Sequence, residues 1–109
     1  MKQSLVKFQL KNFLDKQDHS VLQKIFWTLK LIEENERVPE KYFKKLKNSD
    51  GIWEIRIKVG SNIYRIFSFW DKNNLIILTH GIIKKTQKTP MKEIHLAHAY
   101  KDDYFRRKK

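Results

Sequence analysis

The sequence of 109 residues contains no cysteine, only three glycines and two prolines, and half as many acidic as basic residues. Without cysteine, the chain has neither disulfide bonds nor thiolate metal sites. It has no run of 18 apolar residues and no signal-peptide pattern, so we expect a cytoplasmic protein without a membrane span. The hydrophobic fraction of 40% and the 14 aromatic residues argue against disorder, and the length predicts a single domain over residues 1–109.

Positive charge is the dominant global feature of the composition. The chain has 24 Lys and Arg against 12 Asp and Glu, which gives a net charge of +12. From residue 84 to residue 109 there are nine basic and three acidic residues, or +6. Such an excess predicts a polyanionic partner, either a nucleic acid or an acidic protein.

Two helical segments are predicted in the first third of the chain. The stretch "SVLQKIFWTLKLIEEN" repeats apolar residues at helical spacing, and Ser20 with Gln23 matches a capping box that would start this helix. Residues 4–15 fit a helix, which we favour, although residues 6, 8 and 10 alternate as in a strand. The following "RVPEKYFKKLKNSDG" is expected to be a connector with at most one helical turn.

The second half of the chain predicts three strands and a helix. Strands are expected at about residues 52–59, 63–70 and 75–83, and their short connections require antiparallel hairpins. Thr89 is predicted to cap a last helix with Pro90 at its first position. The expected fold class is α+β, with the helices packed on one face of a small antiparallel meander.

A row of charges follows the first of these strands. Glu54, Arg56 and Lys58 occupy alternate positions and therefore share one face. Arg65 lies in the most apolar part of the next strand, where an arginine is costly unless it is paired or meets a bound anion. Two interpretations of Arg65 follow, namely a structural salt bridge with Glu54 and a site for an anionic ligand.

A basic loop, "KKTQKT", follows the third strand. Its Lys84, Lys85 and Lys88 must lie beside one end of the sheet, where they offer a phosphate site or simply a solvated surface. No set of His and carboxylates has metal-ligand spacing, so we expect neither a metal nor another cofactor.

Several segments together resemble the HigB-like toxins of the RelE superfamily, which belong to type II toxin–antitoxin modules. These segments are "KKLK", "GIWEIRIKVGSNIYRIF", "HGIIKKTQKTP" and a following "EI", and the resemblance runs from about Val21 to the last helix. It implies a RelE-like α+β fold and cleavage of mRNA on the ribosome. It also implies a cognate antitoxin, typically a HigA-like protein with a helix-turn-helix.

The resemblance also implies roles for individual residues. The expected catalytic residues are those that match the strand arginines, the motif glutamate and the basic loop: Glu54, Arg56, Arg65, Lys84 and Lys85. The expected RNA-binding residues are Lys45, Lys47, Lys58 and Lys88. The two arginines would hold the scissile phosphate while the RNA 2′-hydroxyl attacks it, so no metal is required.

Some assignments stay open at this point. Glu54 is either the general base or a residue that orients an arginine, and a lysine with a depressed pKa is another candidate acid or base. Relatives usually begin with a strand, which is either missing here or formed by residues 4–10. Two other functions are a ParE-like gyrase poison without nuclease activity and a non-catalytic basic module that binds nucleic acid.

Overall fold

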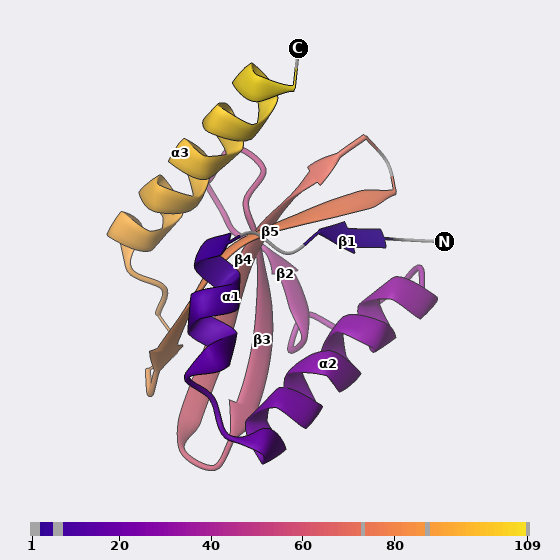
Figure 1. Cartoon of the computed structure of the whole chain (residues 1–109), viewed down its shortest axis with the longest axis vertical. Coiled ribbons are helices and arrows are strands. Elements are labelled where there is room, and N and C mark those ends of the chain that lie inside the picture. Colours follow the sequence, from indigo (N-terminus) through magenta and orange to yellow (C-terminus); the bar gives the residue numbers. More distant parts are fainter. Residues whose placement is uncertain (1–2, 6–7, 73, 87, 109) are drawn as a thin grey trace.

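The computed structural model describes residues 3–5, 8–72, 74–86 and 88–108 (Figure 1). Its elements form an α+β fold that is consistent with the RelE-like fold implied by the resemblance. Its strands are β1 (Gln3–Leu5), β2 (Phe43–Lys45), β3 (Trp53–Val59), β4 (Asn62–Asp71) and β5 (Leu75–Lys84). Its helices are α1 (Phe8–Asp15), α2 (His19–Glu34) and α3 (Met91–Arg107).

The strands form one sheet in the order β1-β5-β4-β3-β2. The pairs between β2, β3, β4 and β5 are antiparallel, and β1 adds a parallel strand beside β5. The predicted meander of three strands is therefore confirmed. The central strand β4 is buried on both faces, which explains why its sequence is apolar at nearly every position.

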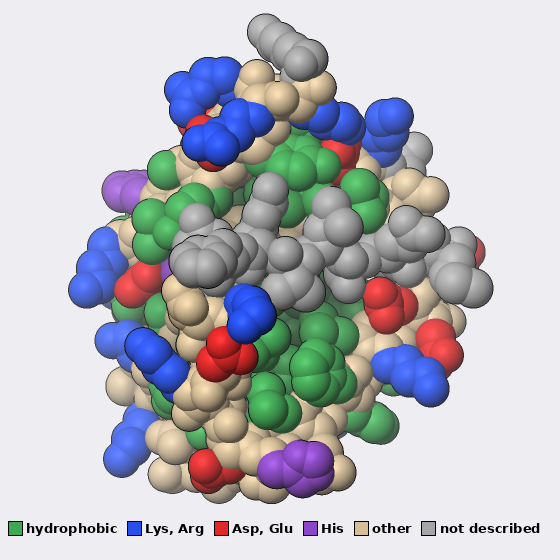
Figure 2. Space-filling model, viewed as in Figure 1, with side chains coloured by type: hydrophobic (Ala, Val, Ile, Leu, Met, Phe, Trp, Pro, Cys, Tyr) green, Lys and Arg blue, Asp and Glu red, His purple; other side chains and the backbone are tan. Residues whose placement is uncertain are grey.

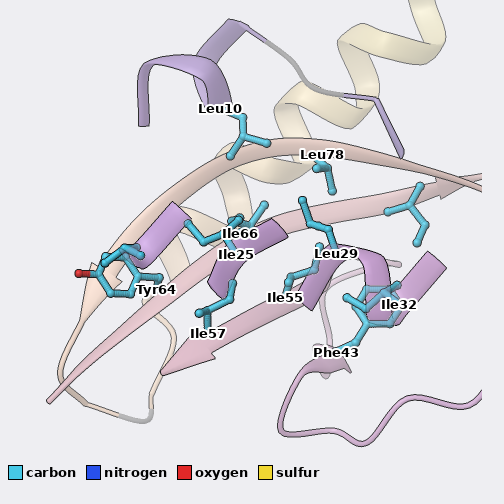
Figure 3. Packing of buried hydrophobic residues seen from close by; sticks show 12 residues of the cluster. Leu10, Ile25, Leu29, Ile32, Phe43, Ile55, Ile57, Tyr64, Ile66 and Leu78 are labelled. Atoms are coloured by element: carbon cyan, nitrogen blue, oxygen red, sulfur yellow. The ribbon is translucent and has the colours of Figure 1, made fainter. Parts of the chain in front are cut away.

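The helices cover both faces of the sheet, so the prediction that they share one face is wrong (Figure 1). On one face, Ile25, Leu29 and Ile32 of α2 point toward Ile55 and Ile57 of β3 (Figure 3). The physical reason for the second layer is the alternation along β4, which turns large apolar side chains to both sides.

A second apolar cluster lies on the other face of the sheet. Ile94 and Ala97 of α3 pack there with Phe67 and Phe69 of β4 and Ile77 of β5. Helix α3 covers only part of this face. The charged residues Glu54 and Arg56 of β3 lie on the same face, beside Ile94 of α3.

The N-terminal segment contains both of the structures considered for it. Residues 3–5 form β1 and residues 8–15 form α1, whereas residues 6 and 7 lie outside the described residues. The strand expected of relatives is thus present, next to β5. Helix α2 begins two residues earlier than predicted, with Asp18 rather than Ser20 at the N-cap position and Ser20 already inside the helix. The capping box of Ser20 and Gln23 is therefore wrong.

The connector before β3 contains a short strand as well as a turn. The backbone N–H groups of Tyr42 and Phe43 both donate to the carbonyl of Pro39, at 2.9 and 3.2 Å, and form the turn. Phe43 then pairs with Ile55 as the first residue of β2. A strand of three residues has almost no periodicity of its own, so these residues form a strand only because they pair with β3.

Hydrophobic side chains gather on one part of the surface. Figure 2 shows hydrophobic side chains between α1 and α2, and Lys and Arg side chains mainly around the outline of that view. None of the helices in the described part of the chain has the length and hydrophobicity needed to cross a bilayer.

Candidate functional site

The charged row of β3 lies on the face of the sheet that α3 covers in part. Arg56 pairs directly with Arg65 of β4, and Glu54 pairs with Phe67. In the neighbouring row, Ile63 of β4 lies between Lys58 of β3 and Lys84 of β5. Residues that pair across an antiparallel ladder share a face, so the register brings these charges together.

Glu54 binds both arginines of the site through different oxygen atoms. Its Oε1 is 3.2 Å from Arg56 Nε, and its Oε2 is 3.6 Å from Arg65 Nη1. The side chain of Glu54 is only 2% exposed, and that of Arg65 is fully buried. Two arginines opposite each other repel, and the shared carboxylate compensates for this repulsion. The salt bridge predicted between Glu54 and Arg65 is therefore present.

The loop before α3 completes the environment of Arg65. Thr89 Oγ1 accepts a hydrogen bond from Arg65 Nη1 at 2.7 Å and donates one to Glu54 Oε2 at 2.5 Å. Arg65 Nη2 donates to the carbonyl oxygen of Thr86. Among the described side chains, Arg65 Nε is the buried polar atom without a hydrogen-bond partner. Burial lowers the pKa of Arg65, Arg56 lowers it further, and Glu54 opposes both effects.

A hollow of about 230 Å³ opens onto this network, and we call it the face hollow. Glu54, Arg56 and Thr89 form its polar part, and Lys44 and Lys47 add two further cations. The Arg56 side chain is 18% exposed, in contrast to the buried Arg65. The face hollow therefore offers an anion one partly accessible guanidinium, held by a carboxylate and flanked by lysines.

The predicted lysines do not all lie at the face hollow. Lys84 lies on the same sheet face as Arg65, in the next row of the ladder, and Lys85 and Lys88 are exposed in the loop that follows. Lys47 lines the face hollow. Lys45 pairs with Trp53 and lies on the opposite sheet face, where it lines a hollow of about 420 Å³.

Sequence reasoning missed two residues of the site, Lys44 and Thr89. Lys44 pairs with Glu54 and so shares its face, but this follows only from the register of β2. Thr89 was predicted to cap the last helix, whereas Pro90 occupies the N-cap position and the Thr89 hydroxyl binds Glu54. The sequence signal for both residues is weak, because the pairing of Lys44 with Glu54 and the hydrogen bond from Thr89 to Glu54 form only in the folded chain.

A histidine lies next to the network, on the other side of Phe67. His80 stacks on Phe67 with ring centroids 4.8 Å apart, and its Nε2 lies 3.2 Å from Glu93 Oε1. Burial lowers the pKa of His80, although Glu93 partly opposes this shift. Within the described ranges, no group of three or more His, Asp or Glu residues is arranged to hold a metal ion.

The chain matches one model of a known protein family over most of its length. A family model described as "Phage derived protein Gp49-like (DUF891)" matches residues 12–102. This range contains every residue of the face hollow. No curated protein matches the chain.

Proposed function

Since the chain belongs to the family of phage-derived Gp49-like proteins, toxin-like modules of toxin–antitoxin systems, we propose that it is a HigB-like mRNA endoribonuclease that acts on the ribosome. The observation that supports this most is the face hollow, where Glu54 holds the partly accessible Arg56 among lysines. A guanidinium in such a position suits a phosphodiester group.

The proposed reaction uses the nucleophile that RNA itself carries. The 2′-oxygen attacks the adjacent phosphorus, its proton passes to a base, and the 5′-oxygen leaves with a proton from an acid. Arg56 would contact the phosphate and stabilise its developing charge, an effect worth roughly 3–4 kcal/mol for one preorganised donor. Lys84 and Lys85 would supply further positive charge or transfer protons.

Two roles change from those implied by the resemblance. Both oxygens of Glu54 already have partners, which supports the orienting role over that of general base. Arg65 is buried beneath Glu54 and Thr89, so we assign it a positioning role. In this arrangement Arg65 holds Glu54, and Glu54 holds Arg56.

The ribosome enters the proposal because the site contains few acid–base groups. A ribosome-bound nuclease can use the positioning of mRNA by the ribosome, and proximity alone can contribute several kcal/mol. The toxin would work in the cytoplasm, where translation occurs. The family suggests an antitoxin as partner, and we propose a HigA-like protein with a helix-turn-helix.

The test compares growth, mRNA integrity and DNA synthesis after induction without the antitoxin. For the wild type we expect growth arrest with cleavage of translated mRNA. Arg56→Ala should strongly reduce both the arrest and the cleavage. The control Lys30→Ala removes an exposed cation of α2 outside the site and should leave both unchanged. Purified protein should cut mRNA with ribosomes present and leave naked RNA largely intact. Arrest of DNA synthesis before any loss of mRNA would favour a gyrase poison. RNA binding without cleavage would favour a non-catalytic module.

A further inference from the structure

A second and larger hollow lies at the edge of the sheet. Strand β2 pairs with β3 only from Trp53 to Ile55, so the rest of β3 has no β2 residue beside it. Between this part of β3, α2 and the turn before β2 lies a hollow of about 510 Å³, which we call the edge hollow. This volume is in the range of small-molecule sites and could hold a nucleotide.

Four cations from three separate segments line the edge hollow. Lys24 comes from α2, Lys41 from the turn, and Arg56 and Lys58 from β3. The lining residues include no Asp or Glu. The ion pairs found in the described part of the chain do not involve Lys24, Lys41 or Lys58. Arg56 shares the carboxylate of Glu54, whereas the other three cations add a positive potential that an anion relieves.

An aromatic surface accompanies these cations. Tyr42 lines the edge hollow, and its ring meets the Trp27 ring edge-on with centroids 5.8 Å apart. Lys41 Nζ lies 5.0 Å from the centre of the Tyr42 ring. Trp27 is 51% exposed, which is unusual for a residue of its size. Rings beside cations are typical of sites where unpaired bases stack and phosphates bind.

We propose that the edge hollow binds single-stranded RNA next to the scissile phosphate, an inference that rests on the proposed function. Arg56 lines both the edge hollow and the face hollow, so a strand can pass from one to the other across this residue. Lys24 and Lys41 bind phosphates beyond Arg56, and Tyr42 stacks on a base. An acidic protein would use the cations, but the aromatic ring inside the hollow favours a nucleotide.

The test measures binding of a labelled single-stranded 2′-O-methyl RNA, which cannot be cleaved through its 2′-oxygen, at several salt concentrations. Lys24→Ala with Lys41→Ala should weaken binding and reduce the slope of log Kd against log salt by about 1.4, from two phosphate contacts. The matched control, Lys16→Ala with Lys30→Ala, removes the same charge at exposed positions outside both hollows and should leave the slope nearly unchanged.

Tyr42→Leu tests the stacking separately from the charge. Loss of one stacked base should weaken binding roughly 5- to 150-fold, the equivalent of about 1–3 kcal/mol, with the salt slope unchanged. Thermal unfolding of each variant identifies any that fail to fold, and Tyr42→Phe, which keeps the ring, should restore binding.

The outcomes separate this site from the proposed function. If substitution of Lys24 and Lys41 weakens RNA binding but no mRNA is ever cut, RNA binding by the edge hollow is supported and the proposed nuclease activity is overturned. If mRNA is cut and the Lys24/Lys41 variant behaves like its control, the edge hollow is overturned. The same is true if the Lys24/Lys41 variant loses antitoxin binding alone, because the hollow would then bind an acidic protein.

Discussion

Arg65 shows how burial changes the interpretation of a single residue. The apolar sequence around it is compatible with a phosphate clamp, yet its side chain is fully buried against Glu54, Thr86 and Thr89. Contact with a substrate would require this network to open. Through these side-chain contacts, Arg65 positions Glu54, and Glu54 in turn positions Arg56.

We predict that Arg65→Ala destabilises the protein by about 3–5 kcal/mol, because it removes a fully buried side chain and one of the two guanidinium partners of the buried Glu54 carboxylate. Urea unfolding followed by circular dichroism measures the loss. Arg65→Met combined with Glu54→Gln removes the buried pair of charges together and should recover part of the stability, while Arg56, whose side chain is 18% exposed, loses its ion pair with Glu54. An Arg65→Ala protein that unfolds at the wild-type urea concentration, yet fails to cut mRNA, would restore the direct phosphate role.

His80 should make the stability depend on pH. Burial lowers its folded-state pKa below the ordinary value of 6.5, so below that pH the unfolded chain binds more protons. The contribution of neutral His80 is therefore present above about pH 6.5 and is lost as the pH falls toward the lower folded-state pKa. Glu93 and Tyr100 of α3 are the titratable groups in contact with the ring.

We predict that His80→Gln flattens the fall in stability between pH 7 and pH 5. The slope that a single group contributes is at most about 1.4 kcal/mol per pH unit. Urea midpoints of both proteins at the two pH values provide the measurement. The same difference in midpoint for wild type and variant would show that other groups carry the pH dependence.

At the scale of elements, the packing of α1 on β5 depends on a missing side chain. A Cβ atom at Gly81 would lie 2.6 Å from the nearest ring carbon of Phe13, closer than real Cβ contacts. Glycine is needed here to make space for the ring rather than for an unusual backbone angle. The sequence alone does not reveal this, since Phe13 and Gly81 meet only in the folded chain.

We predict that Gly81→Ala destabilises the protein by about 1–3 kcal/mol through overpacking. Phe13→Ala should cost less in the Gly81→Ala background than in the wild type, because the clash is then relieved as the ring is removed. A double-mutant cycle by urea unfolding measures this coupling, which we expect to be about 0.5–3 kcal/mol. Additive effects of the two substitutions would contradict the predicted contact.

At the scale of the whole molecule, the net charge of +12 decides how partners approach. In the last helix, Arg106 and Arg107 already pair with Asp103, so part of the basic C-terminal charge is neutralised internally. Other cations of the chain line the two hollows. A partner that covers them must bring negative charge.

We predict that the antitoxin is acidic where it meets this chain, over the strand and loop charges or the terminal helices. Its affinity should fall as salt rises from 50 to 300 mM, approximate limits chosen to change the screening length. Surface plasmon resonance at several salt concentrations, with glycerol as an uncharged control solute, provides the measurement. Affinity that ignores ionic strength would contradict the electrostatic part of this prediction.

The sequence by itself determined the elements that have their own periodicity. Strands β3, β4 and β5 end within one or two residues of their predicted bounds, and α2 follows its apolar stripe. The shared face of Glu54 and Arg56 also follows from alternation alone. These features depend on neighbours along the chain, and the printed sequence contains them.

Only the tertiary structure decided what depends on contacts between distant segments. Strand β2 exists because β3 pairs with it, and its register places Lys44 rather than Lys45 beside Glu54. Thr89 binds Glu54 across 35 positions of sequence instead of capping α3. Helix α3 packs on the second face of the sheet because Phe67 and Phe69 form an apolar surface there. The burial of Arg65 follows from all of these contacts together, since the free energy of a charge depends on everything packed around it.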